Sequence, residues 1–123
     1  MNTIERAAEI VEEVTQALTA AGVDFALVTA DLLKVPAALA NGPTVAVQPP
    51  KLRYITYTAT DATWELYVIA GPTADRLKAW ANIEPILSAL QEPLSLDTAE
   101  PANFSHPNMP DYPAYVVSFT ETI

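Results

Sequence analysis

Two neighbouring β-rich runs in the middle of the chain constrain the fold more than any other feature. Residues 51–60 and 63–70 are rich in Tyr, Thr, Ile and Val, and the dipeptide Asp61-Ala62 separates them. Strand-forming residues in two runs with so short a break are typical of a β-hairpin. The sequence therefore predicts that a sheet, and not a helical bundle, forms the centre of the protein.

The second of these runs is apolar on both faces. Trp64, Leu66 and Val68 alternate along one face, while Tyr67 and Ile69 lie with Glu65 on the other. A sheet face that meets water is usually polar, so both faces are expected to be covered. We predict helices on one side and consider a second protein chain for the other.

Two segments predict helices. In residues 2–21, Asn2 is placed to cap the helix with Glu5 three residues on, and Gly22 ends it. The apolar residues with helical spacing in this segment are Ile4, Ala7, Ala8, Val11, Val14, Leu18 and Ala21. A second helix is predicted to begin at Thr73, to be kinked or divided at Pro85 and to stop at Pro93. Its expected apolar side consists of Leu77, Trp80, Ala81, Ile83, Leu87 and Leu90.

The remaining segments predict short strands and loops. A half-buried strand is expected over residues 44–48, between Pro43 and Pro49-Pro50, and a longer strand over residues 114–122. Weaker strand signals lie in residues 23–28 and 94–98, and residues 31–39 predict a helical turn broken by Pro36. Residues 1–123 thus predict one α+β domain, with two helices on one face of a mainly antiparallel sheet of four or five strands.

Composition excludes several kinds of function. The chain has no cysteine, one histidine and three separated glycines, so thiol chemistry, multi-histidine metal sites and Gly-rich phosphate loops are excluded. Six Lys and Arg against fifteen Asp and Glu give a net charge of −9, which repels nucleic acid and anionic lipid on average. No apolar run is long enough to span a membrane, and we expect a soluble, unexported protein that needs no cofactor.

The few groups that could carry catalysis lie close together in a Pro-rich stretch. Ser105, His106 and Asp111 suggest a hydrolase, but no nucleophile turn or oxyanion donors accompany them. Asp97 and Glu100 could join His106 in a metal site, without a recognisable spacing. We therefore expect no enzyme activity.

The aromatic residues and the cations suggest where the chain meets a partner. The aromatic residues of the strands are expected to pack in the core: Tyr54, Tyr57, Trp64, Tyr67, Tyr115 and Phe119. Residues 32–60 contain Lys34, Lys51 and Arg53 but no acid, and this basic band could bind an acidic partner or another copy. Apolar residues on both sheet faces also indicate a protein interface.

The order of these segments resembles one protein family. The acidic N-terminal helix, the Pro-flanked strand at residues 43–50, the hairpin leading into the helix at Thr73, and the closing strand at residues 113–120 are similar to the tail terminator proteins of long-tailed, non-contractile bacteriophages, particularly those of actinobacteria. The resemblance implies a virion structural protein, assembled in the host cytoplasm, that forms a six-fold ring on the finished tail tube. It further implies that the ring stops tube polymerisation, contacts the tail tube protein and the head-tail connector protein, and lets DNA pass without specific binding.

Loops held by a rigid sheet commonly form assembly surfaces, and two are candidates here. The predicted interface residues are Lys34, Pro49, Pro50, Lys51, Arg53, Phe104, His106, Met109 and Tyr112. Three other hypotheses stay open: a head-tail joining protein of the phage neck, a small non-enzymatic binding domain outside phage biology, and a hydrolase centred on His106.

Overall fold

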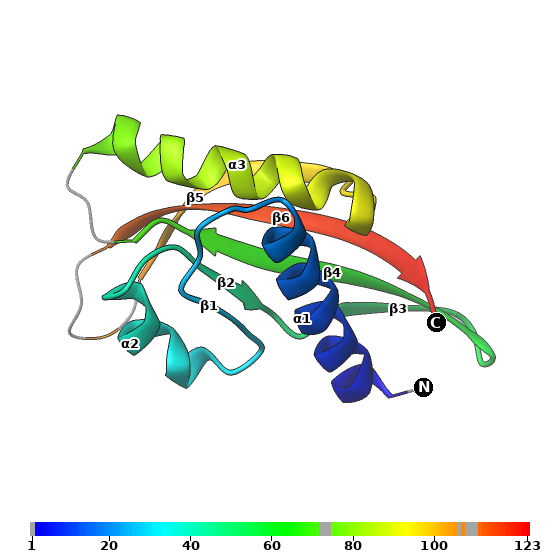
Figure 1. Cartoon of the computed structure of the whole chain (residues 1–123). Helices are drawn as coiled ribbons and strands as arrows, with labels where there is room; N and C mark the ends of the chain where they lie inside the picture. Colours follow the sequence, from blue (N-terminus) through cyan, green and yellow to red (C-terminus); the bar gives the residue numbers. More distant parts are fainter. Residues whose placement is uncertain (1, 72–74, 106, 108–110) are drawn as a thin grey trace.

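The computed structural model describes residues 2–71, 75–105, 107 and 111–123, and it confirms the α+β class. The elements run, in chain order, α1 (Thr3–Ala20), β1 (Leu27–Thr29), the 3-10 turn η1 (Leu32–Lys34), α2 (Val35–Leu39), β2 (Thr44–Val47), β3 (Lys51–Thr56), β4 (Ala59–Ile69), α3 (Arg76–Leu94), β5 (Thr98–Phe104) and β6 (Tyr112–Thr122). Figure 1 shows α1 and α3 side by side in front of the sheet.

The described strands form one mixed sheet of six, where four or five were predicted. Its order is β1-β2-β4-β6-β5, with β3 as a further partner of β4. Only β1 and β2 pair in parallel among these strands. The expected strand near residues 94–98 lies further along the chain as β5, at the edge of the sheet, where Pro101 can be accommodated without interrupting a central ladder.

The eleven-residue strand β4 pairs on one side with two strands in succession. Its C-terminal half pairs with β2, and its N-terminal half pairs with β3. Pro49-Pro50 separates β2 from β3, because prolines have no N–H to donate to the ladder. The predicted turn at Asp61-Ala62 is wrong: both residues pair within β4, and the chain reverses at Tyr57-Thr58 instead.

The first helix begins as predicted, but the residues that it buries are not all those predicted. The Asn2 side chain accepts a hydrogen bond from the Glu5 backbone N–H at 3.1 Å. Ile10, Val14 and Leu18, spaced by four, are the fully buried residues of α1, whereas Ile4 is 83% exposed. The prediction that Ile4 belongs to the core is therefore wrong.

The other helix of this layer, α3, runs unbroken past Pro85. Its N-cap is Asp75, which accepts from the Leu77 N–H, and the predicted cap Thr73 lies outside the described residues. Pro85 is exposed and does not divide the helix; Pro93 lies in its last turn, which ends at Leu94. The buried residues of α3 are Ala79, Ile83, Ile86, Leu90 and Leu94, so Leu77 and Trp80, both predicted to be apolar contacts, are instead exposed.

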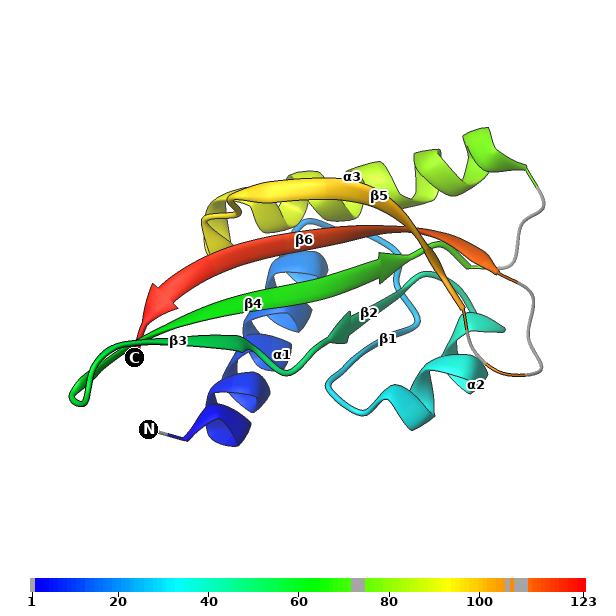
Figure 2. The same cartoon turned by 180° about the vertical axis from the view of Figure 1, so that it is seen from behind.

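The opposite face of the sheet is covered by α2, an element that the sequence predicted only as a broken turn. Pro36 lies at the start of α2, where its missing N–H costs nothing. Val35 and Leu39 of α2 pack with Ile69 and Phe104 in a second, smaller core. Figure 2 shows α2 on this side, away from α1 and α3. Part of the face for which a second chain was considered is thus covered within the molecule, and β2, predicted to be half-buried, is buried on both sides.

A polar network joins α1 to the end of the sheet. Glu121 on β6 accepts two hydrogen bonds from Arg6, at 2.7 and 3.0 Å, and one from the indole N–H of Trp64, at 3.0 Å. Trp64 is fully buried. The hydrogen bond with Glu121 raises the pKa of Arg6 further above its usual value, which keeps the guanidinium charged.

A close approach between two loops leaves no room for a side chain. An added Cβ at Gly71, which follows β4, would lie 2.8 Å from the carbonyl carbon and Cα of Gly42, which precedes β2. These contacts are with backbone, so a larger residue at position 71 would have to push the two loops apart.

Candidate functional site

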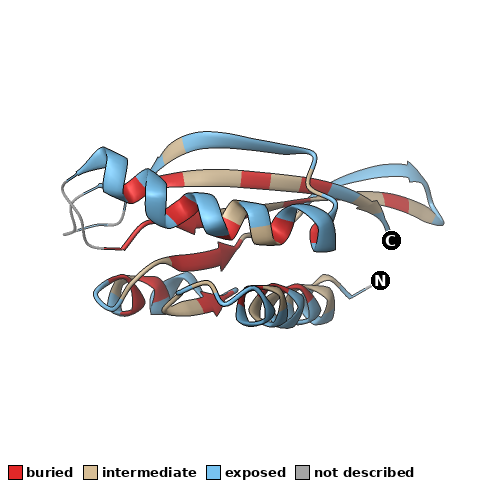
Figure 3. Cartoon of the chain, turned by 45° about the horizontal axis from the view of Figure 1, so that its top comes forward, coloured by how far each residue is buried: buried red, intermediate tan, exposed pale blue. Residues whose placement is uncertain are grey.

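A hairpin projects from the domain and packs little against the rest of it; we call it the hairpin arm. It consists of β3, the turn Tyr57-Thr58 and the beginning of β4 up to Thr63. All six residues of β3 are exposed. Figure 3 shows this exposed strand and turn extending beyond the layer of helices.

The arm has an apolar side and a basic side. Leu52 and Tyr54 pair with Ala62 and Thr60, which face the helices, so they share that face of the sheet. Lys51 and Arg53 point to the opposite face, because successive side chains alternate along a strand.

The two cations of the basic side differ in their partners. Lys51 forms an ion pair with Glu65 at 2.9 Å, and the resulting hydrogen bond raises the pKa of Lys51. No described carboxylate forms an ion pair with Arg53, which leaves its charge available to a partner.

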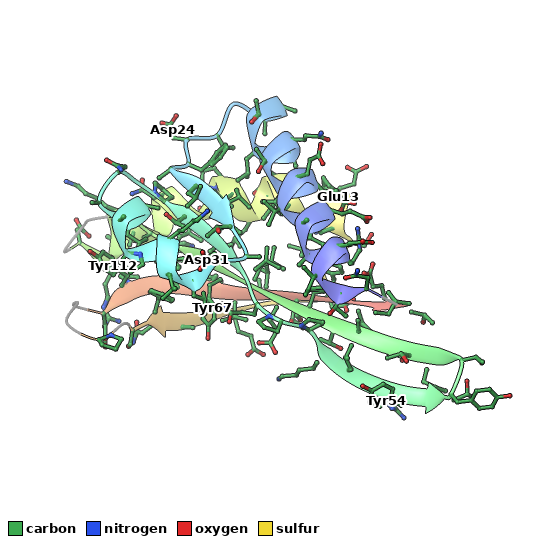
Figure 4. The ribbon with its side chains drawn as sticks, turned by 90° about the horizontal axis from the view of Figure 1, so that it is seen from below. Glu13, Asp24, Asp31, Tyr54, Tyr67 and Tyr112 are labelled. Atoms are coloured by element: carbon green, nitrogen blue, oxygen red, sulfur yellow. The ribbon has the colours of Figure 1, made fainter. Side chains whose placement is uncertain are left out.

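Aromatic and aliphatic side chains of the arm meet water. Tyr57 is as exposed as in an extended peptide, Tyr54 is 73% exposed and Ile55 is 54% exposed. Figure 4 shows Tyr54 on β3, well away from the helices. The prediction that Tyr54 and Tyr57 belong to the core is wrong, because the arm extends past the end of the helical layer; Trp64 and Phe119, also predicted as core, are buried.

An apolar groove of about 370 Å³ lies at the base of the arm. Its walls come from the first two turns of α1, from the end of β2 and from the Pro49-Pro50 link, with Trp64 beneath them. Ile4, which is 83% exposed, and Gln48 also line it. The Nε2 of Gln48 is buried without a hydrogen-bond partner in the described part of the chain.

One edge of this groove is acidic. Ala8 lines the groove, and Glu5 and Glu12 lie three and four residues from it, which makes them its neighbours on the helix surface. No described cation forms an ion pair with either. The remaining acids of this helix face, Glu9 and Glu13, are both bound by Arg6.

The predicted interface residues do not gather at one place. Pro49 and Pro50 line the groove, and Lys51 and Arg53 lie on the adjoining arm. Lys34 ends η1 next to α2, at the opposite end of the molecule from the β3–β4 turn, so the three cations of the basic band do not form one patch (Figures 1 and 2).

The second predicted loop contributes less than expected. Phe104 is only 8% exposed and packs edge-on against Tyr67, with ring centroids 5.9 Å apart, so little of its ring is left for a partner to contact. Tyr112 is half-buried against the same cluster. His106 and Met109 lie outside the described residues.

Sequence reasoning missed Leu52, Ile55 and Ile4 as surface residues. No local signal marks the arm, because the register that places Ala62, Asp61 and Thr60 opposite Leu52, Arg53 and Tyr54 comes from the structure.

The described residues offer little to catalysis. The Ser105 hydroxyl donates directly to Asp111 at 2.7 Å, a contact that joins the two ends of the β5–β6 connection. In the described part of the chain, no three His, Asp or Glu side chains come together as a metal site would require. Nor is any described helix both long and apolar enough to cross a membrane.

Comparison with known proteins adds no assignment. No model of a protein family matches the chain, and no curated protein matches it either.

Proposed function

We propose that the protein is a structural component of a phage tail, which assembles as a ring on the end of the tail tube, stops the addition of tube subunits and offers a surface for head attachment. The observation that carries this proposal is the hairpin arm. A chain of this size that leaves a whole strand and two tyrosines in water has surface to bury against another protein.

The arm and the groove are two different surfaces, as the contacts of a subunit in a ring require. In a closed ring each subunit presents two different, complementary patches, one to each neighbour. The arm is apolar and basic, whereas the groove is apolar with an acidic edge. The order of α1, the Pro-flanked β2, the hairpin, α3 and β6 supports the same reading, because it is the order that resembles tail terminators.

The overall charge suits a ring around a DNA passage. A net charge of −9 disfavours adhesion of DNA to the protein surface. The cations of the arm would be turned to a protein neighbour and not to the lumen.

Electron microscopy of particles made after disruption of this gene, in the genome that carries it, tests the proposal. Headless tails of irregular and excessive length are expected, because nothing would then end tube growth. Tails of normal length lying beside unattached filled heads would replace the proposal with a head-joining role. Intact infectious particles would refute both.

A variant experiment tests the part played by the arm. Lys51→Glu combined with Arg53→Glu reverses the basic side without touching a buried residue. We expect abnormal tail length or failed head joining, while Arg76→Glu with Lys78→Glu makes the same charge change at exposed positions outside the arm and serves as the matched control. Wild-type particles from the arm variant would contradict the role of the basic side.

A further inference from the structure

The hairpin arm and the groove at its base match in apolar character and charge, but they lie too far apart in one chain to contact each other. We infer that the arm of one copy docks in the groove of the next, with Tyr57 inserted between α1 and Pro49-Pro50. This inference rests on the proposed ring and names its contact.

The apolar parts fit each other in kind and amount. Tyr57, the most exposed large side chain among the described residues, lies at the tip, and a groove of about 370 Å³ with mostly apolar walls has room for such a ring. Tyr54 and Leu52 continue the apolar side behind it. A tyrosine ring buries apolar area and still needs a partner for its hydroxyl, and at an open groove water can remain that partner.

The charges favour the same pairing. Arg53 lacks a described ion-pair partner on its own chain, and Glu5 and Glu12 lack one beside the groove. A docked arm brings one unpaired cation to an edge that carries two unpaired acids.

Because of its length, the arm can fill the groove of a second copy but not the groove of its own chain. The groove lies at the base of the arm and Tyr57 at its tip, and the six residues of β3 at about 3.3 Å each place them roughly 20 Å apart. An arm paired along β4 cannot fold back into its own groove. The contact is therefore head to tail, and each copy both gives an arm and receives one.

A single contact of this kind is small. Two docked tyrosines bury roughly 300–500 Å² of the arm, so both partners together lose less than the about 1,200 Å² of a standard interface. We expect separate chains in dilute solution and stable association only when the ring closes, because closure gives every copy two contacts.

Disulfide cross-linking of the full-length chain tests the contact, since the protein has no cysteine of its own. One tagged chain carries Thr58→Cys, which keeps the neighbouring Tyr57, and an untagged chain carries Ile4→Cys; both positions are exposed. In a concentrated mixture under mild oxidation, we expect mixed dimers to form at least ten times faster than with Leu33→Cys in place of Ile4→Cys. Leu33 is 84% exposed and lies on η1, so it is a matched control.

The double variant, with both cysteines in one chain, should give a ladder of cross-linked species that ends at a closed ring. Arg53→Glu in the Thr58→Cys chain should slow mixed-dimer formation several-fold at low salt, and Glu12→Lys in the Ile4→Cys chain should restore it. Mixed dimers no faster than those of the Leu33→Cys control would overturn the inference, as would Thr58→Cys chains that link to one another faster than to Ile4→Cys.

The two proposals fail in different ways. Rapid 4–58 cross-links together with normal tails after gene disruption would leave the ring contact standing and remove the terminator role. Overlong tails together with cross-linking at the control rate would keep the role and reject this contact.

Discussion

Replacing Glu121 by Ala removes the acceptor shared by Arg6 and Trp64, and its effect on stability can be worked out from the contacts. The buried indole N–H of Trp64 loses its partner, which costs about 1–3 kcal/mol. The two hydrogen bonds from Arg6 add about 1 kcal/mol more, a low value because both side chains are about one quarter exposed. We expect the free energy of unfolding to fall by roughly 2–4 kcal/mol.

Urea unfolding followed by tryptophan fluorescence measures this change, and calorimetry gives the accompanying shift in Tm. For 123 residues the unfolding entropy is about 0.26 kcal/mol/K, so the melting temperature should fall by roughly 8–15 °C. Glu121→Gln keeps an oxygen for Trp64 and should recover about half of the loss.

Glu13→Ala is the matched control, because it removes one exposed contact of the same Arg6 and should change stability by less than about 0.5 kcal/mol. If Glu121→Ala were as mild as this control, the indole N–H would not depend on Glu121, and the account of how α1 is tied to the sheet would be refuted.

Three further predictions concern stability and titration. Pro85→Ala restores a helical N–H at an exposed position of α3 and should raise the urea-unfolding free energy by about 1–3 kcal/mol; a loss of stability would mean that packing of α3 needs the proline. Gly71→Ala should lower the free energy of unfolding by about 1–3 kcal/mol through the clash with the Gly42 backbone. Gly22 has a φ of +68° but open space where a Cβ would lie, so Gly22→Ala should lower the same free energy by only about 1 kcal/mol. Glu65 raises the pKa of Lys51, so Lys51 is fully charged well below pH 10.5 and its contribution to the pair is lost as the pH rises through the raised value. Glu65→Gln should return the Lys51 titration, followed by NMR, towards 10.5, and an unchanged midpoint would show that the pair does not form in solution.

The sequence predicted best what local patterns determine. The cap at Asn2, the end of α1 before Gly22, the strand after Pro43 and the long closing strand follow from residue types within a few positions of each other. The mixed sheet was harder, because β1 is only three residues long and pairs with β2 across a connection that contains α2. A three-residue strand has no periodicity to recognise.

The surface was predicted least well, because exposure depends on where the helices stop. Tyr54 and Trp64 both lie in β-rich segments, yet one projects past the helical layer and the other lies beneath it. Phe104 was expected on the surface because its neighbours are prolines and polar residues, but α2 and Tyr67 enclose it. The groove joins α1 to the Pro49-Pro50 link, more than forty residues along the chain, and no local pattern contains that contact.

The length of the hairpin arm has a consequence for size. If each arm tip occupies the groove of the next copy, neighbouring grooves are as far apart as one tip is from its own groove, about 20 Å. In a six-fold ring the spacing of neighbours equals their distance from the axis, so the grooves would lie on a circle of about that radius. Removing one cross-strand pair from the arm shortens it by about 3.4 Å and would draw the circle in by the same amount. The number of residues between Pro50 and Tyr57 would thus set the radius of the proposed ring.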